Sequence, residues 1–180
     1  MEPLLPFVTA DQKKCIGCRV CEIACHSYHH VVGKTIGTVI DPIVPKLYPQ
    51  RENSQKVLVQ CHQCEGAPCA QVCALKAIRV HHRRIMVDRI RCDGCGDCIK
   101  VCPFGAIRLA LFKQDESMVE LGGGATRLVP NKCDLCLGRE QGPVCVEECP
   151  AQALCLVHPL KDKRTKNRMT VENSKYLIRK

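Results

Sequence analysis

The stretch Cys92-Asp-Gly-Cys95-Gly-Asp-Cys98-Ile-Lys-Val-Cys102-Pro103 decides the fold of this 180-residue chain. Its cysteines are separated by two, two and three residues, and a proline follows the last one. Related runs occur at three other places, each with the same two-residue gap after its first cysteine. The four runs contain all but one of the 17 cysteines: Cys15, Cys18, Cys21 and Cys25; Cys61, Cys64, Cys69 and Cys73; Cys92, Cys95, Cys98 and Cys102; Cys133, Cys136, Cys145 and Cys149.

The composition indicates that bound metal replaces part of an ordinary core. There is no Trp, with only three Phe and three Tyr, so the large side chains that dominate core energetics are scarce. Disulfides or metal must then stabilise the fold. The cysteine count is odd, no signal peptide opens the chain and no apolar stretch approaches 18 residues. We therefore expect a cytoplasmic protein with no direct membrane insertion, whose cysteines bind metal.

The runs belong to an internal repeat. After the last cysteine of three runs the chain reads Ala77-Ile-Arg-Val80, Ala106-Ile-Arg-Leu109 and Ala153-Leu-Cys-Leu156. Each unit is predicted as a strand, a cysteine loop, one helical turn and a second strand. The leftover Cys155 falls in the arginine column of this alignment, where period-two alternation points it away from the apolar face. We therefore expect Cys155 not to be a ligand.

The spacing between runs suggests how the units pair. Only 18 residues separate Cys73 from Cys92, and they are predicted as a hairpin with strands 77–80 and 85–88. The other gaps are 35 and 30 residues. The predicted fold is α+β, with two tandem two-cluster, ferredoxin-like modules of small hairpins and short helices, one inserted in the other. The inner module is 61–110 and the outer one is 1–60 plus 111–160, followed by a basic tail, 161–180.

The connections between units carry weaker signals. Residues 26–60 contain several prolines and are predicted as a loop with a short strand at 57–59. Gly122-Gly-Gly124 indicates a turn. His26, His29 and His30 fall in that predicted loop, and His81 and His82 fall in the hairpin turn, so surface or supporting roles are favoured over metal ligation.

The cysteine spacing is that of the bacterial ferredoxin run for a [4Fe–4S] cluster. Three thiolates within seven residues can hold one corner of a cubane, and the fourth cysteine reaches the neighbouring cluster. Structural zinc sites are usually built from two separated cysteine pairs, into which the x2-x2 triplets do not divide. Zinc remains an alternative mainly for the second and fourth runs, whose spacing is irregular. Four [4Fe–4S] clusters are the expected cofactors.

The charge balance argues against nucleic-acid binding. The formal net charge is +9. Sixteen thiolates and four oxidised cores would together add about −8 and leave the loaded protein near +1. Residues 161–180 hold eight Lys/Arg, two Asp/Glu and a single aromatic residue, Tyr176, and not the series of interleaved aromatic residues typical of nucleic-acid binding. The charged residues Lys13, Lys14, Arg19, Arg91 and Lys132 lie beside cluster cysteines and are interpreted as solvated surface charge or as groups that raise cluster potentials.

These runs resemble those of the four-cluster, ferredoxin-type electron-transfer subunits that partner molybdenum or tungsten enzymes and hydrogenases. The similarity covers about residues 7–158 and is closest to the small iron–sulfur subunits of formate dehydrogenase and formate hydrogenlyase; the β-subunits of dimethyl sulfoxide reductase-type enzymes are also similar. It rests on the segments Lys14–Cys25, Cys61–Cys69, Cys102–Ile107 and Asn131–Pro150. Ala74 stands where the family usually has proline after the second run.

The resemblance implies crossed ligation between units. We name each resulting group of four cysteines by the run that supplies three of them. The first set is Cys15, Cys18, Cys21 and Cys149; the second is Cys61, Cys64, Cys69 and Cys102; the third is Cys92, Cys95, Cys98 and Cys73; the fourth is Cys133, Cys136, Cys145 and Cys25.

Sixteen cysteines for four clusters leave no open iron, so the chain is expected to transfer single electrons and to catalyse no reaction. A globule of this length is about 40 Å across, which would place four clusters on the order of 10 Å apart. The expected partners are a formate dehydrogenase-type catalytic subunit at one end and a hydrogenase or another iron–sulfur subunit at the other. Two alternatives remain open: an accessory or maturation iron–sulfur protein, and an electron carrier for carbon monoxide dehydrogenase.

Overall fold

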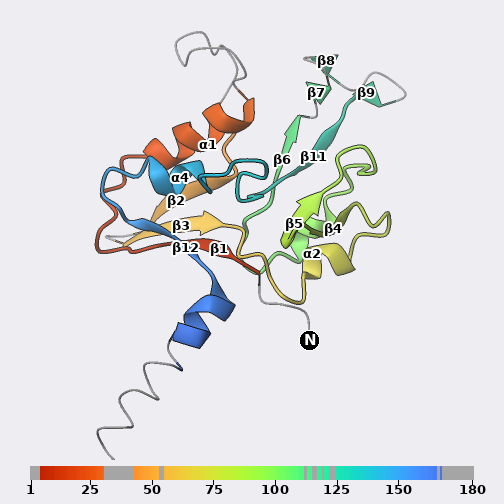
Figure 1. Cartoon of the computed structure of the whole chain (residues 1–180). Coiled ribbons are helices and arrows are strands. Elements are labelled where there is room, and N and C mark those ends of the chain that lie inside the picture. Colours follow the sequence, from red (N-terminus) through yellow and green to blue (C-terminus); the bar gives the residue numbers. More distant parts are fainter. Residues whose placement is uncertain are drawn as a thin grey trace, which may run out of the picture.

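The computed structural model describes residues 5–30, 43–52, 55–111, 113–114, 117–118, 120–121, 125–165 and 167. Within these residues, short strands pair two by two and short helices begin within the cysteine runs (Figure 1). The predicted mixture of small strands and short helices is confirmed. Gly122–Gly124 and most of the basic tail lie outside the described residues, although 159–165 are helical.

Two antiparallel strand pairs occupy equivalent places in the repeat. β1 (Phe7–Ala10) pairs with β12 (Leu154–Val157), and β4 (Ile78–His81) pairs with β5 (Arg84–Val87). The amide of Asp11 donates to the carbonyl of Ala153 at 2.7 Å, and that of Asp88 donates to Ala77, also at 2.7 Å. The first unit therefore lies against the fourth in the way that the third lies against the second.

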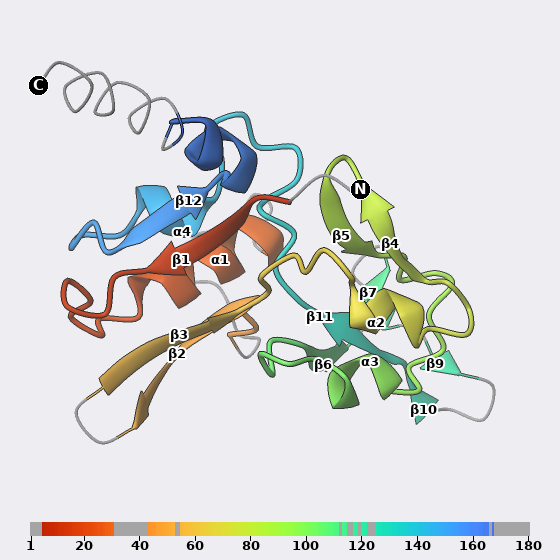
Figure 2. The ribbon, with the colours of Figure 1, turned by 90° about the horizontal axis from the view of Figure 1, so that it is seen from below.

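The remaining strands form antiparallel pairs that connect these units. β2 (Leu47–Glu52) pairs with β3 (Gln55–Gln60), and β6 (Arg108–Leu111) pairs with β11 (Leu128–Asn131). The segment between β6 and β11 contributes β7 (Lys113–Gln114), β8 (Ser117–Met118), β9 (Glu120–Leu121) and β10 (Ala125–Thr126). In both views β1, β2, β3 and β12 lie on one side of the molecule, and β4 and β5 lie on the other (Figures 1 and 2).

The helices pack in the same pairs of units. α1 (Val20–His30) lies against α4 (Val144–Glu147), and α2 (Pro68–Gln71) lies against α3 (Asp97–Lys100). The single turns predicted for the last three units are confirmed. The prediction is wrong for the first unit, because α1 has 11 residues. No proline follows Cys25, so the chain can continue the helix there, although the same is true after Cys73, where α2 has only four residues.

The predicted loop over residues 26–60 is also corrected. His26, His29 and His30 lie in α1, and β2 and β3 form a hairpin in place of the single short strand. Residues 31–42 of that stretch lie outside the described residues. β4 and β5 begin and end within one residue of the predicted hairpin strands.

Cysteine side chains make up much of the interior. One buried cluster joins Cys25, Cys133 and Cys145 to Val8 and Leu154. Another joins Cys69 and Cys98 to Ile78, Ile85 and Ile107. Two-stranded hairpins are only marginally stable alone, so these sulfur-rich cores are what the hairpins pack around.

The repeat positions are buried as the alignment predicts. Ala77, Ala106 and Ala153 are buried in equivalent places, and each is followed by a buried Ile or Leu. Cys155 is exposed on β12, opposite Thr9, as its place in the arginine column predicts.

Candidate metal centres

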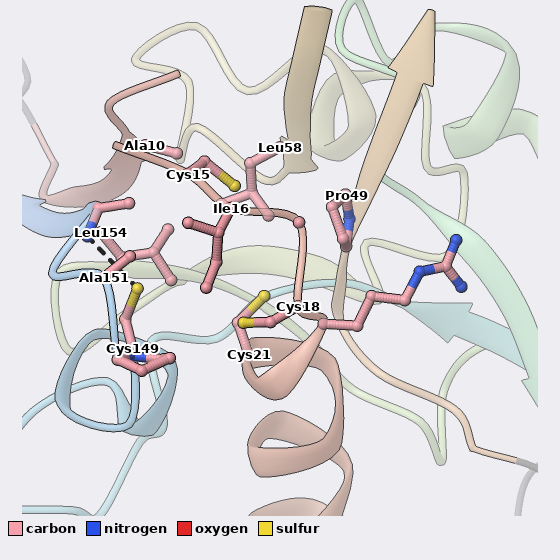
Figure 3. A pocket seen from close by; sticks show the side chains of 14 residues that line it. Ala10, Cys15, Ile16, Cys18, Cys21, Pro49, Leu58, Cys149, Ala151 and Leu154 are labelled. Carbon is pink, nitrogen blue, oxygen red and sulfur yellow. Dashed lines mark hydrogen bonds between the residues drawn. The ribbon is translucent and has the colours of Figure 1, made fainter. Parts of the chain in front are cut away.

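The four thiols of the first set line one hollow. Cys15 and Cys18 come from the loop before α1, Cys21 comes from the first turn of α1, and Cys149 comes from the loop after α4. The wall of this hollow is almost entirely apolar. Figure 3 shows the four sulfur atoms around it, with Leu58 and Leu154 among the side chains that close it. Four soft sulfur donors in an apolar hollow suit an iron–sulfur cluster.

The thiols of the second set affect one another's acidity. Burial and then the neighbouring Cys61 raise the pKa of Cys64, and Cys102 also contributes. Burial raises the pKa of Cys69 to about 11, and the Cys61, Cys102 and Cys64 thiols add to this rise, while Lys132 opposes it. The second run and Cys102, from the unit that follows it, therefore meet in space.

The third and fourth sets show the same pattern. Burial raises the pKa of Cys92, and Cys73 adds to that effect from the other side of the β4–β5 hairpin. Burial raises the pKa of Cys145 above the usual thiol range, and Cys133, Cys25 and Cys136 contribute in that order. In each case a cysteine of one run lies near the last cysteine of another.

Three pairs of thiols from different sets lie in the same buried clusters and interact electrostatically. Cys145 lies near Cys21, Cys133 lies near Cys61, and Cys98 lies near Cys69, each contributing to the raised pKa of its neighbour. These pairs connect the fourth set to the first, the fourth to the second, and the third to the second. The sets therefore adjoin in the order first, fourth, second, third.

Backbone amides point at the sulfur atoms in a repeated way. Ala77, Ala106 and Ala153 each donate an N–H to the cysteine four residues earlier, at 3.3, 3.4 and 3.3 Å. Leu135 and Gly94 donate in the same way to the cysteine two residues earlier, both at 3.4 Å. Such amides stabilise thiolate charge, which tunes the properties of sulfur-ligated clusters.

The exposure of the cysteines differs between the two terminal sets of this order, the first and third, and the two inner sets. Cys18 in the first set and Cys95 in the third set are exposed. All four cysteines of the fourth set are buried, and those of the second set are buried or half-buried. The two terminal sets therefore each have one exposed cysteine, and the two inner sets have none.

A buried network of charges supports the fourth set. Nε2 of His29 lies 2.9 Å from Oδ1 of Asp134, and Nζ of Lys46 lies 2.6 Å from Oδ2. The Lys46 amide also donates to Sγ of Cys25 at 3.3 Å. Burial alone would raise the pKa of Asp134, but the bond to His29 and the charge of Lys46 outweigh it and hold the pKa well below its usual range.

A second network joins the second and fourth runs to β5. Nε2 of Gln63 donates to the carbonyl of Cys133 at 2.9 Å, and Oε1 of Gln63 accepts from the amide of Ile85 at 2.7 Å. Nζ of Lys132 donates to the carbonyls of Ile85 and Cys133. Gln63 and Lys132 are both buried, which corrects the interpretation of Lys132 as solvated surface charge. Lys13, Lys14, Arg19 and Arg91 are exposed, as that interpretation expects.

Sequence reasoning missed Lys46, Asp134 and Gln63, whereas it had given His29 a surface or supporting role, and the bond to Asp134 is a supporting one. One signal was present, since Asp93 and Asp134 each follow the first cysteine of a run. Both carboxylates accept the amide two residues later, at 3.1 and 3.0 Å. The described residues include no group of three Cys, His, Asp or Glu side chains placed to hold a single metal ion, and no described helix could span a membrane.

Comparisons with known proteins agree with this chemistry. Residues 84–151 match a family model described as a 4Fe–4S dicluster domain. The chain is 40% identical over 148 residues to the Escherichia coli K12 protein YsaA, covering 82% of this chain and 87% of YsaA. It is 37% identical over 152 residues to the electron transport protein HydN of the same strain, covering 84% and 87% of the two chains. Formate hydrogenlyase subunit 2 of that strain is 33% identical over 172 residues, covering 84% and 81%.

Proposed function

The chain belongs to the family of iron–sulfur electron-transport proteins that includes YsaA and HydN, and from this membership we propose that it relays single electrons through four [4Fe–4S] clusters between two partner proteins. Each cluster supplies reversible one-electron chemistry when bound. The cysteines hold the clusters as the four sets defined above. Their apolar surroundings and the amides that point at sulfur determine how readily each site takes up charge.

The observation that carries this proposal is the single order in which the sets adjoin. A carrier that accepts and returns an electron at one place needs one accessible site. Here the thiol pairs Cys21–Cys145, Cys133–Cys61 and Cys69–Cys98 join all four sets in one line. The line ends at exposed Cys18 on one side and exposed Cys95 on the other. Such a line suits transfer between two partners rather than storage.

The paired strands support a division into two modules, with the first and fourth units in one and the second and third in the other. We infer the boundaries 1–60 plus 111–160 for the outer module and 61–110 for the inner one. The contacts of α1 with α4 and of α2 with α3 favour this division. The Cys133–Cys61 pair then joins one module to the other.

The proposed partners are a formate dehydrogenase-type catalytic subunit and a hydrogenase or another iron–sulfur subunit. The similarity to formate hydrogenlyase subunit 2 supports this assignment. With every proposed cluster held by four thiols, the chain itself binds no substrate at iron. An accessory protein that transfers electrons or clusters without staying bound is the second candidate, because HydN is named only as an electron transport protein.

Anaerobic purification with its native partners tests the proposal. We expect about sixteen iron and about sixteen sulfide per chain, four reduction steps by electron paramagnetic resonance, and co-purification of a molybdenum or tungsten enzyme subunit. Iron for only two clusters would refute the four-cluster relay. Full iron without a stably bound partner would favour the accessory protein, and zinc in place of iron would refute both.

A further inference from the structure

Lys132 is a buried cation at the junction of the two inner sets. It follows β11 and directly precedes Cys133, and only 4% of its surface is exposed. Nζ donates to the carbonyl of Ile85 in β5 and, at 3.0 Å, to the carbonyl of Cys133. Lysine is almost never fully buried unless its charge is paired. The two neutral carbonyls orient the ammonium, and no carboxylate among the described residues forms an ion pair with it.

The carboxylate in the same cavity wall is already engaged by other side chains. Lys132 lines a small cavity together with Lys46, Arg89 and Asp134. Both oxygens of Asp134 are engaged, one with His29 and the other with Lys46. This cavity wall therefore has three cationic side chains to one carboxylate, and Lys132 is the cation among them that is buried without an ion-pair contact to it.

The charge of Lys132 faces the second set. Its ammonium shares the carbonyl of Cys133 with Nε2 of Gln63, which lies between Cys61 and Cys64 in the second run. Gln63 fixes this geometry, because it ties the carbonyl of Cys133 to the amide of Ile85, the residue whose carbonyl Lys132 binds. The ammonium is thus held beside the place where four thiolates and an iron–sulfur core would add negative charge.

We propose that Lys132 is a positioning residue whose buried charge raises the reduction potential of the cluster held by Cys61, Cys64, Cys69 and Cys102. The inference rests on the proposed function and deepens it. A buried cation near a cluster favours the reduced form, which carries one more negative charge, and the low local dielectric strengthens that effect. The cluster of the second set would then bind the electron more tightly than it would without Lys132.

Redox titration of the holoprotein, followed by electron paramagnetic resonance, tests the role of Lys132. Lys132→Met removes the charge at similar volume, and Lys132→Gln also keeps a hydrogen-bond donor. Lys132→Arg retains the charge. Lys100→Met is the matched control, because Lys100 lies two residues from Cys98 and Cys102 but its side chain is 74% exposed.

We expect Lys132→Met to keep its iron while one of the four reduction steps moves to lower potential. The expected change is about tenfold in the reduction equilibrium, or 59 mV for one electron. Lys132→Arg should have reduction potentials close to those of the wild type, and Lys100→Met should leave the potentials of all four steps unchanged. Unshifted steps in Lys132→Met, an equal shift in Lys100→Met, or iron loss in both Lys132→Met and Lys132→Gln would overturn the inference. A wild-type protein without four reduction steps would instead refute the proposed function.

Discussion

Nζ of Lys46 lies 2.6 Å from Oδ2 of Asp134, so a buried ion pair fastens the segment before β2 to the loop of the fourth run. His29 completes the network from α1. Three segments far apart in sequence therefore depend on one carboxylate, and all three contribute to the surroundings of Cys25 and Cys136.

Asp134→Asn should destabilise the protein strongly. The change leaves Lys46 buried without its counter-charge, and breaking a buried ion pair from one side costs about 3 kcal/mol. The expected result is a lower denaturant midpoint when cluster absorbance is followed anaerobically. Asp97→Asn is the control, because its partner Lys100 and Asp97 itself are largely exposed and such pairs contribute little. Similar midpoints for the two variants would contradict a structural role for the network.

Gly94→Ala should disrupt the third run. Gly94 has φ of +83°, and a Cβ there would lie 2.4 Å from the carbonyl oxygen of Leu128 in β11. Backbone must move to relieve that contact, which would displace the amide that donates to Cys92. We expect the loss of about four iron per chain, measured by metal analysis after anaerobic purification.

Gly96→Ala is the matched control for Gly94. Gly96 has nearly the same backbone conformation, with φ of +80°, but a Cβ there would meet nothing within 4 Å. It therefore carries only the left-handed conformational penalty of about 1–2 kcal/mol. Iron contents that fall equally in both variants would show that the backbone conformation, and not the approach to Leu128, is the requirement.

The repeat made part of the fold predictable. Aligning the repeat units at Ala77, Ala106 and Ala153 predicted where the strands, turns and buried positions fall. The short gap between Cys73 and Cys92 predicted the β4–β5 hairpin. These features depend on local spacing, which a sequence shows directly. The exposed position of Cys155 follows from the same register.

Long-range polar contacts were not predictable in this way. Lys46 and Asp134 are 88 residues apart, and Gln63 reaches a carbonyl 70 residues away. Nothing in the local pattern distinguishes buried Lys132 from exposed Lys13, since both lie beside a run. Their burial depends on how the units pack, and only the folded chain brings β5, β11 and the second run together.

Val8→Asp should remove the clusters of the proposed outer module and leave those of the inner module in place. Val8 is fully buried in β1 and lies opposite Leu156 of β12, so a carboxylate there would be placed in the core of the first and fourth units. If the modules are stable independently, iron should fall from about sixteen to about eight per chain. Thr9→Asp, at the neighbouring position opposite exposed Cys155, should keep its iron. Complete loss of iron in Val8→Asp would mean that the two modules unfold as one unit.

Cys149→Ala and Cys155→Ala should distinguish a cluster ligand from a non-ligand cysteine in the same repeat unit. Cys149 lines the hollow of the first set and accepts the amide of Ala153 at 3.3 Å, whereas Cys155 is exposed on β12. We expect Cys149→Ala to lose up to about four iron per chain and the corresponding reduction step in a spin-quantified redox titration. Cys155→Ala should match the wild type in both measurements. Equal iron loss in the two variants would require a different assignment of ligands in the fourth unit.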